Sequence, residues 1–339
     1  MPSTNHPPKT LAANQVETET VDNIYQPATW RDAGLRYHQL RFFLRRQFGH
    51  DVRKLSVDGR FGCPNVDGTI STGGCIFCDA KSFSPSLYHC DGAIAKQISE
   101  SAVRINRRYG AEHFLAYFQP GTNTHAPLKR LRSLYQEALA QDSVVGLVVG
   151  TRPDCVGNDV LDLLQELAET TWVSLELGLQ SIHDSSLAWL RRGHDYAAFA
   201  DAVERSRARG LHLGAHVILG LPNEAPQHMC ETAAEIARLG IDAVKIHNLF
   251  AAKGTPLAEA VHDGSLKLIG RDEYIEHLVN FIEQLPPRCV IDRLIAETPS
   301  CYLFGPAWCQ NKNDVLDAIH AELNRRDTWQ GRAFTDNSR

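Results

Sequence analysis

The feature that most restricts the fold is a regular alternation of short apolar segments with longer amphipathic ones. The apolar segments predict six β-strands, at residues 53–59, 112–118, 144–150, 171–178, 211–220 and 242–250. Each is followed by a segment with helical periodicity, at residues 91–110, 126–141, 158–170, 196–210, 229–240 and 270–285. Such alternation predicts a parallel sheet covered by helices.

Two architectures are built from such units. Right-handed crossovers curl a parallel sheet into a full or partial β/α barrel, whereas a doubly wound arrangement leaves the sheet open. The dinucleotide-binding form of the open sheet is disfavoured, because no Gly-x-Gly-x-x-Gly pattern follows the first predicted strand. We therefore predict an α/β protein with a partial (β/α)6 TIM-like barrel, an N-terminal helix and a small C-terminal extension.

Three regions are expected along the chain. Residues 1–30 are polar and contain proline, which is typical of a disordered tail. Residues 31–285 form the barrel domain with its leading helix, and residues 286–339 form the C-terminal extension.

The leading helix, expected between residues 36 and 54, has an apolar face and a basic face. The apolar face contains Leu40, Phe43, Leu44 and Phe48, and the basic residues are Arg36, Arg41, Arg45 and Arg46. We expect this helix to pack along the side of the barrel and to reach the rim, where its arginines would contact RNA phosphates. A solvated helix face is the commoner explanation of such charges.

Composition limits the classes of function. The formal net charge of −5 argues against a protein that binds nucleic acid over its whole surface, and leaves only a local RNA contact. No apolar run is long enough for a membrane span, and the N-terminus lacks the charged-then-apolar order of a signal peptide. We therefore expect a cytoplasmic protein, whose nine cysteines are not a disulfide framework.

Three cysteines follow the first predicted strand within one glycine-rich loop: Cys63, Cys75 and Cys78. In a β/α barrel, active sites lie at this end of the strands. A structural zinc site would need a fourth ligand, for which Cys90 is the candidate. The alternative is an iron–sulfur cubane held by three thiolates, with one open iron that binds the amino and carboxylate groups of S-adenosylmethionine.

Motifs in the order found in a known family extend from residue 63 to residue 257. They are CPNVDGTISTGGCIFC, YFQPGTNT, GTRPDC, LELGLQS, RRGHD, HVILGLP and VKIHNLFAAKGTPL. On these motifs the chain resembles the radical S-adenosylmethionine (radical SAM) superfamily. Within it, the chain is similar to the bacterial YhcC/YtqA-type family, with the radical domain of the elongator catalytic subunit as a more distant relative. The gap between the first two cysteines is longer than the best-known superfamily spacing and is typical of the YhcC/YtqA-type family.

The resemblance implies a radical SAM enzyme with a 4Fe–4S cluster and SAM as cofactors. Cys63, Cys75 and Cys78 would hold the cluster and act in catalysis, and reductive cleavage of SAM would give a 5′-deoxyadenosyl radical. The distant relative points to modification of a tRNA nucleoside, with a reductant protein of the flavodoxin or ferredoxin type as a partner. Two alternatives stay open: a radical enzyme acting on a small metabolite or peptide, and a non-catalytic binding protein stabilised by zinc.

The resemblance also implies cofactor-binding residues near the cysteines. Phe77 would pack near the adenine of SAM. The segment with Gln119, Thr122 and Asn123 would hold the methionine amino group. Loop packing and ordinary turn chemistry are the alternative explanations of these residues.

Other residues at the ends of the strands have polar or basic side chains. Arg152 is expected to hold a carboxylate or to pair with Asp154. Glu176 is predicted to point into the barrel, where it would contact SAM or Arg152. Gln180 extends the same edge. Arg192 would bind the SAM carboxylate or a phosphate, and a solvated turn is the alternative explanation of this residue. The two strand histidines, His216 and His247, are interpreted as core residues and not as catalysts.

Overall fold

The chain folds around one parallel sheet. The computed structural model describes residues 27–79, 82 and 92–335, so most of the expected disordered tail, and Cys90, lie outside the described residues. The strand order in the sheet is β1-β2-β3-β4-β5-β6-β8. The bounds are β1 Val52–Val57, β2 His113–Phe118, β3 Val144–Thr151, β4 Trp172–Gln180, β5 His212–Leu219, β6 Ala243–Asn248 and β8 Val290–Arg293.

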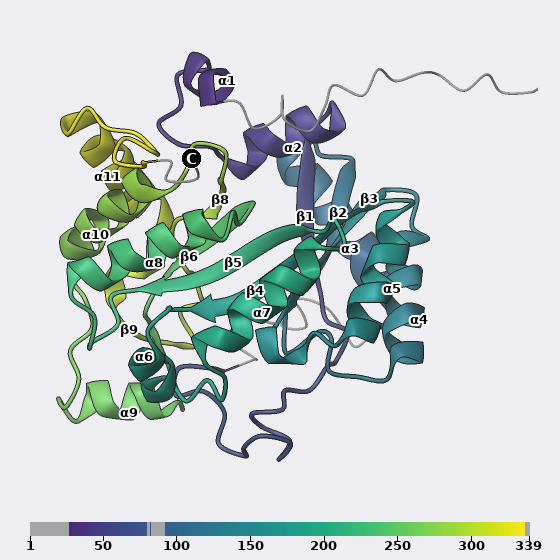
Figure 1. Cartoon of the computed structure of the whole chain (residues 1–339), viewed down its shortest axis with the longest axis horizontal. Coiled ribbons are helices and arrows are strands. Elements are labelled where there is room, and N and C mark those ends of the chain that lie inside the picture. Colours follow the sequence, from purple (N-terminus) through teal and green to yellow (C-terminus); the bar gives the residue numbers. More distant parts are fainter. Residues whose placement is uncertain (1–26, 80–81, 83–91, 336–339) are drawn as a thin grey trace, which may run out of the picture.

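Helices connect these strands and cover the outer face of the curled sheet (Figure 1). The crossover helices are α3 Ile94–Tyr109, α4 Leu128–Leu139, α5 Asn158–Ala168, α7 Tyr196–Arg207, α8 Pro226–Arg238 and α10 Arg271–Gln284. The remaining α-helices are α1 Pro27–Asp32, α2 Leu40–Phe48, α6 Asp184–Trp189, α9 Pro256–His262 and α11 Lys312–Arg325. Two short 3-10 helices, η4 Pro153–Cys155 and η5 Ala307–Gln310, and a two-stranded sheet of β7 Ala251–Ala252 and β9 Leu303–Gly305 complete the described elements. Among the described residues, no helix is long and apolar enough to cross a membrane.

The predicted α/β half-barrel is confirmed, and all six predicted strands are present. The structure adds a seventh strand, β8, which pairs in parallel with β6 and comes from the segment assigned to the C-terminal extension. Four residues are too few for a periodic pattern to develop, so β8 leaves no clear signal in the sequence. The division of the chain at residue 285 stays a prediction, although β8 ties the following segment to the barrel sheet.

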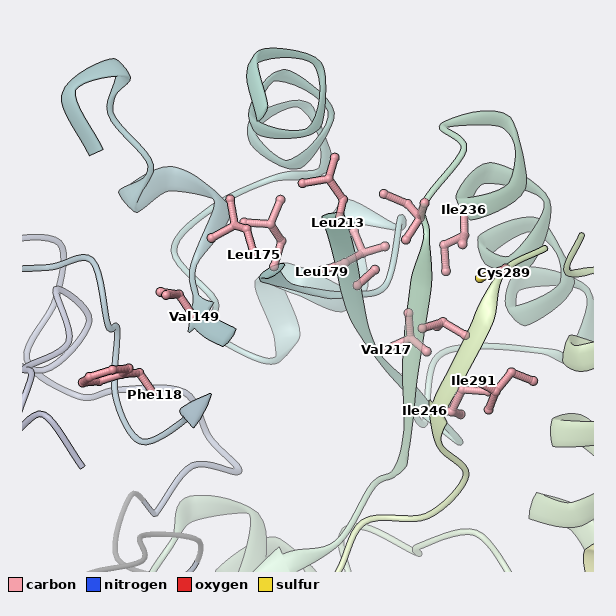
Figure 2. Packing of buried hydrophobic residues seen from close by; sticks show 14 of the residues in the cluster. Phe118, Val149, Leu175, Leu179, Leu213, Val217, Ile236, Ile246, Cys289 and Ile291 are labelled. Atoms are coloured by element: carbon pink, nitrogen blue, oxygen red, sulfur yellow. The ribbon is translucent and has the colours of Figure 1, made fainter. Parts of the chain in front are cut away.

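The main hydrophobic core lies between the sheet and the surrounding helices. On each strand, alternate side chains face this layer, as the period of two residues in a β-strand requires. Figure 2 shows Val149, Leu175 and Val217 on neighbouring strands, with Ile236 of α8 among the residues that meet the sheet. The residues between these positions point to the concave side, so the inside of the half-barrel has its own side-chain chemistry.

Helix α2 closes the N-terminal end of the half-barrel. Phe43 and Leu44 are buried against Val52, Ala243 and Val290, which are the first residues of β1, β6 and β8. The Phe43 ring also lies 5.5 Å from the imidazole of His212, at the start of β5. The helix thus covers this end of the strands, and we call the opposite end the rim.

This placement corrects the expectation for the leading helix. The helix is shorter than residues 36–54, since Gly49 ends it in a left-handed conformation and β1 begins at Val52. Its arginines do not reach the rim, because α2 packs at the other end of the strands (Figure 1). Arg41 pairs with Asp51 at 2.9 Å, and Arg36, which precedes the helix, pairs with Asp327 at 2.9 Å.

Side chains join the two edge strands of the open sheet. Lys54 of β1 donates to Asp292 of β8 at 2.6 Å, across the gap between the edges. Below this contact, Gln39 forms an isolated parallel bridge with Ile291. Near the end covered by α2, the two edge strands are therefore linked by the Lys54–Asp292 ion pair and by the residues that lead into α2.

Candidate functional site

The loop of the three cysteines folds back on itself at the rim. The Val66 and Asp67 amides both donate to the Cys63 carbonyl, at 2.8 and 3.0 Å. Gly74 has a φ of +68°, which glycine adopts without strain, and its amide donates to the Asn65 carbonyl at 2.8 Å. The long gap between the first two cysteines is thus taken up by a compact turn.

The Cys75 sulfur lies in a buried, donor-rich position. The residue is 6% exposed, and its Sγ accepts from Asn65 Nδ2 and from Arg192 Nη1, each at 3.4 Å. Hydrogen-bond donors around a cysteine sulfur are typical of metal-binding cysteines, whose ligands are oriented by such contacts. Arg192 is thereby brought to the cysteine loop, as expected for a rim residue.

The donor chemistry fits an iron–sulfur cluster held by three thiolates. Thiolates are the preferred ligands of Fe–S clusters and of zinc. In the parts of the chain that the structure describes, no three His, Cys, Asp or Glu side chains are gathered in a metal-holding arrangement. The fit therefore rests on the identity of Cys63, Cys75 and Cys78 and on the bonds to Cys75. The Cys90 alternative lies outside the described residues.

The Cys75–Cys78 turn sits over the ends of β5 and β6. The Ile76 amide donates to the Leu190 carbonyl at 3.2 Å, and the Ile76 carbonyl accepts from the Leu257 amide at 3.0 Å. Ile76 is buried against Ile218 and Leu249, and the half-buried Phe77 packs against the same cluster. The predicted contact of Phe77 with adenine stays a prediction.

The segment after β2 is bonded to the cysteine loop. The Thr122 amide donates to the Gly62 carbonyl at 3.0 Å, and a Cβ on Gly121 would lie 2.6 Å from the Phe61 carbonyl oxygen. Only glycine allows this approach. Asn123 Nδ2 donates to the Gly150 carbonyl at 2.7 Å, and Gln119 Oε1 accepts from Ser56 at 2.7 Å.

Two buried arginines lie next to this segment at the rim. Arg152 binds Asp154 through two bonds of 2.9 and 2.8 Å, so the alternative pairing considered for it is present. Arg192 Nη2 donates to the Gly178 carbonyl at 3.1 Å. A Cβ on Gly178 would lie 2.9 Å from Arg192 Nη2 and 3.0 Å from Gln180 Nε2, so the glycine makes room for both.

Several buried polar atoms at the rim have no partner within the described residues. Among them are Asn123 Oδ1, Arg152 Nη1 and Arg192 Nε. Buried polar groups are rarely left without a hydrogen bond, so each such group requires an explanation. One acceptor and two cationic donors suit a ligand that has both an ammonium and a carboxylate, as SAM does. The roles of these residues and of Gln180 in binding SAM stay predictions.

Glu176 occupies a different place from the one expected. It points inward, as predicted, but it lies in the middle of β4, and the structure does not pair it with Arg152. Instead its carboxylate accepts from Lys54 at 2.5 Å, from His216 at 2.7 Å and from Lys245 at 3.3 Å. Gly214 on β5 admits this side chain, because a Cβ there would lie 3.0 Å from Glu176 Cγ.

These contacts belong to a set of six side chains inside the half-barrel, which we call the interior network. Its members are Lys54, Tyr117, Glu176, His216, Lys245 and Asp292. Lys245 donates to the Tyr117 hydroxyl at 2.8 Å and lies 3.8 Å from Asp292. Two lysines thus face two carboxylates, so the network carries no net charge when both lysines are protonated.

The interior network holds its carboxylates in the ionised form. Burial alone would raise the pKa of Glu176, but Lys245 and Lys54 outweigh it and hold that pKa well below its usual range. Burial lowers the pKa of Lys245 to about 8, although Glu176 and Asp292 act in the opposite direction. Lys54 has shorter bonds to both carboxylates, which overcome the effect of its burial and raise its pKa.

Sequence reasoning missed the interior network. Its members come from six strands, and Lys54 and Asp292 are separated by 238 positions. The one available signal was a run of charged residues at inward positions of apolar strands, such as Lys245 between Val244 and Ile246. His216, interpreted as a core residue, belongs to this network and is bonded to a carboxylate.

The comparisons with known proteins agree with this geometry. Residues 67–236 match the family model of the radical SAM superfamily, and residues 241–325 match that of the radical SAM C-terminal domain. YtqA of Bacillus subtilis (strain 168) is 38% identical over 91% of this chain and 96% of its own length. The tRNA uridine(34) acetyltransferase of Methanocaldococcus jannaschii is 28% identical over 44% of this chain and 28% of its own length.

A solved structure shares the fold. The structure of the archaeal Methanocaldococcus infernus Elp3 with residues 1–46 deleted aligns with a TM-score of 0.60, at 18% identity, over 82% of this chain and 64% of that one. Together with the two family models, this confirms the expected fold and cofactor class. The chain is a radical SAM enzyme that uses a 4Fe–4S cluster and SAM, and it belongs to the YhcC/YtqA family of the radical SAM superfamily.

Proposed function

We propose that this enzyme cleaves SAM reductively at a cluster held by Cys63, Cys75 and Cys78, and uses the radical to modify RNA at a tRNA nucleoside. The observation that carries the first part is the buried Cys75 sulfur with its two N–H donors, beside unpartnered buried atoms of Arg152, Arg192 and Asn123. Cys63, Cys75 and Cys78 would hold the cluster, and the cluster would supply the electron for reductive cleavage of SAM to a 5′-deoxyadenosyl radical.

The residues of this chain bind and position the cosubstrate. Arg192 links the Cys75 sulfur to the Gly178 carbonyl, so one side chain joins the cysteine loop to the end of β4. The guanidinium groups of Arg152 and Arg192 favour a carboxylate at the rim, and Asn123 Oδ1 favours an ammonium group. Because α2 covers the other end of the half-barrel, the substrate has to enter past the same rim.

The RNA substrate is supported by a partial relative. The acetyltransferase of Methanocaldococcus jannaschii, named for uridine 34 of tRNA, matches 44% of this chain, whereas this chain matches only 28% of that protein. The activity of that whole protein therefore supports the proposal for this chain only by analogy. The arginines near α2 do not support RNA binding at the rim, since they lie at the opposite end. The expected reductant is a flavodoxin- or ferredoxin-type protein, and the expected location is the cytoplasm.

The test compares the nucleosides of total tRNA from cells with the gene, without it, and complemented with Cys75→Ser. We expect one nucleoside mass to disappear on deletion, to return with the wild-type gene and to stay absent with the variant. Mass spectrometry of digested tRNA measures this directly. If all nucleosides are unchanged while the purified enzyme releases 5′-deoxyadenosine from SAM, a small metabolite or a peptide is the substrate.

A further inference from the structure

His216 has the geometry of an acid–base residue that a neighbouring carboxylate orients. Its Nε2 lies 2.7 Å from Glu176 Oε2. The pKa of Glu176 lies well below its usual range despite the opposing effect of burial, because Lys245 and Lys54 are close, so this carboxylate only accepts hydrogen bonds. His216 Nε2 must therefore carry the proton, and in the neutral ring Nδ1 keeps a free lone pair.

The free nitrogen is placed where a substrate can meet it. Of the ion-paired side chains of the interior network, His216 is the most exposed, with 19% of its side chain accessible compared with 4% for Lys245 and 5% for Glu176. Among the described residues, no group is bonded to Nδ1. The neighbours of His216 on β5, Ala215 and Val217, face the outer core, so the imidazole faces the concave side.

The position of His216 along its strand also suits contact with a substrate that enters from the rim. On β6, Ala243 touches the α2 cluster, and Leu249, just beyond the strand, packs against Ile76 of the cysteine loop. Lys245, which is paired with His216 in the sheet, lies between these two levels. His216 is therefore above the closed end of the half-barrel and below the rim where the cysteines lie.

The rest of the interior network maintains this arrangement. Five other strands contribute charged and titratable groups that lie near His216 or near its direct neighbours: Lys54, Tyr117, Glu176, Lys245 with His247, and Asp292 with Arg293. Burial lowers the pKa of His216 more than the bond to Glu176 raises it, so the ring is neutral near pH 7. Replacing such buried charges with apolar residues is often neutral or stabilising, so stability does not explain their presence.

We infer that His216 is a general acid–base residue that touches the substrate, with Glu176 as the residue that orients it. In the step, the Nδ1 lone pair takes a proton from an N–H or O–H group of the substrate, which keeps the electron pair of the broken bond. No oxidant or reductant is needed for this transfer. The inference rests on the proposed function for its substrate class, an RNA nucleobase with an N–H group.

The test uses the reconstituted enzyme, SAM, a reductant and total tRNA from cells that lack the gene. His216→Gln keeps an N–H donor for Glu176 but has no proton-accepting ring nitrogen. We expect it to form the modified nucleoside roughly 10²–10⁴-fold more slowly than wild type. Release of 5′-deoxyadenosine without RNA is expected to stay at the wild-type rate. In His216→Gly, added imidazole is expected to restore nucleoside formation.

His212→Gln is the matched control, because His212 is on the concave side of the same strand but is bonded to Ser174 at 2.9 Å and packs on Phe43. We expect it to modify RNA at the wild-type rate. Wild-type nucleoside formation by His216→Gln overturns the inference, and so does a parallel loss of 5′-deoxyadenosine release, which indicates a structural role. If wild type cleaves SAM but leaves tRNA unchanged, the proposed RNA substrate is refuted and the inference falls with it.

Discussion

Replacing Lys54 with methionine should destabilise the half-barrel strongly, because one ammonium group serves both carboxylates of the interior network. Lys54 lies 2.5 Å from Glu176 and 2.6 Å from Asp292. Without it, Glu176 keeps Lys245 and His216, but the nearest remaining lysine to Asp292 is Lys245, at 3.8 Å. Removing one partner of a buried ion pair costs about 3–5 kcal/mol, and we expect Lys54→Met to lower the free energy of unfolding by that amount.

The double variant Lys54→Met/Asp292→Leu separates the charge effect from lost packing. It leaves one lysine and one carboxylate, so its stability should return to within about 2 kcal/mol of wild type. Urea unfolding at pH 7 and 25 °C, followed by far-ultraviolet circular dichroism, gives both values. A cost below about 1 kcal/mol for the single variant, or a double variant less stable than the single one, would refute the role of Lys54 in joining the edges.

The same residue controls acid stability. Burial would raise the pKa of Asp292 and of Glu176, but the lysines outweigh it and lower both below their ordinary values of 3.8 and 4.5. A carboxylate whose pKa is lowered in the folded state contributes stability at pH values above its ordinary pKa. That contribution is lost as the pH falls through the folded pKa. In Lys54→Met both folded pKa values rise, so we expect acid unfolding to begin at a higher pH than in wild type.

Three further outcomes follow from the structure. Phe43→Ala removes the ring that plugs the closed end, so we expect a loss of about 3–5 kcal/mol in unfolding free energy with unchanged iron content per folded chain. Arg192→Ala removes the bonds to Cys75 and to the Gly178 carbonyl, and equilibrium dialysis should show SAM affinity falling by about tenfold or more while iron is retained. A triple variant has glutamine in place of the α2 arginines Arg41, Arg45 and Arg46. Its tRNA binding should keep the wild-type salt dependence in filter-binding assays, because this helix lies away from the rim.

The layout of strands and helices was predictable because it depends on periodicity within short segments. Each predicted strand is a segment of seven or more residues with apolar side chains in succession or in alternation, and each crossover helix shows a repeated apolar face. The strand β8 was not predictable, since it has only four residues and its pairing with β6 is a tertiary event. The position of α2 was also hidden, because an apolar helix face does not specify which surface it covers.

In the candidate site too, some residues were predictable from the sequence and others were not. The cysteines and Arg152 are found in short motifs, and the pairing of Arg152 with Asp154 joins residues two positions apart. The interior network depends on inward positions of distant strands, which only the curvature of the sheet brings together. A strand histidine such as His216 is commonly a core residue, and its bond to Glu176 becomes visible only in three dimensions.

The central claim is that Cys63, Cys75 and Cys78 hold a cluster that cleaves SAM. The most direct measurement is the iron content of anaerobically reconstituted protein together with 5′-deoxyadenosine release after addition of SAM and a reductant. For wild type and Cys90→Ser we predict about four irons per chain and a brown protein that releases 5′-deoxyadenosine. In Cys75→Ser, both signals should be lost. A colourless wild-type protein with one zinc per chain, lost in Cys90→Ser, and no 5′-deoxyadenosine would contradict the account.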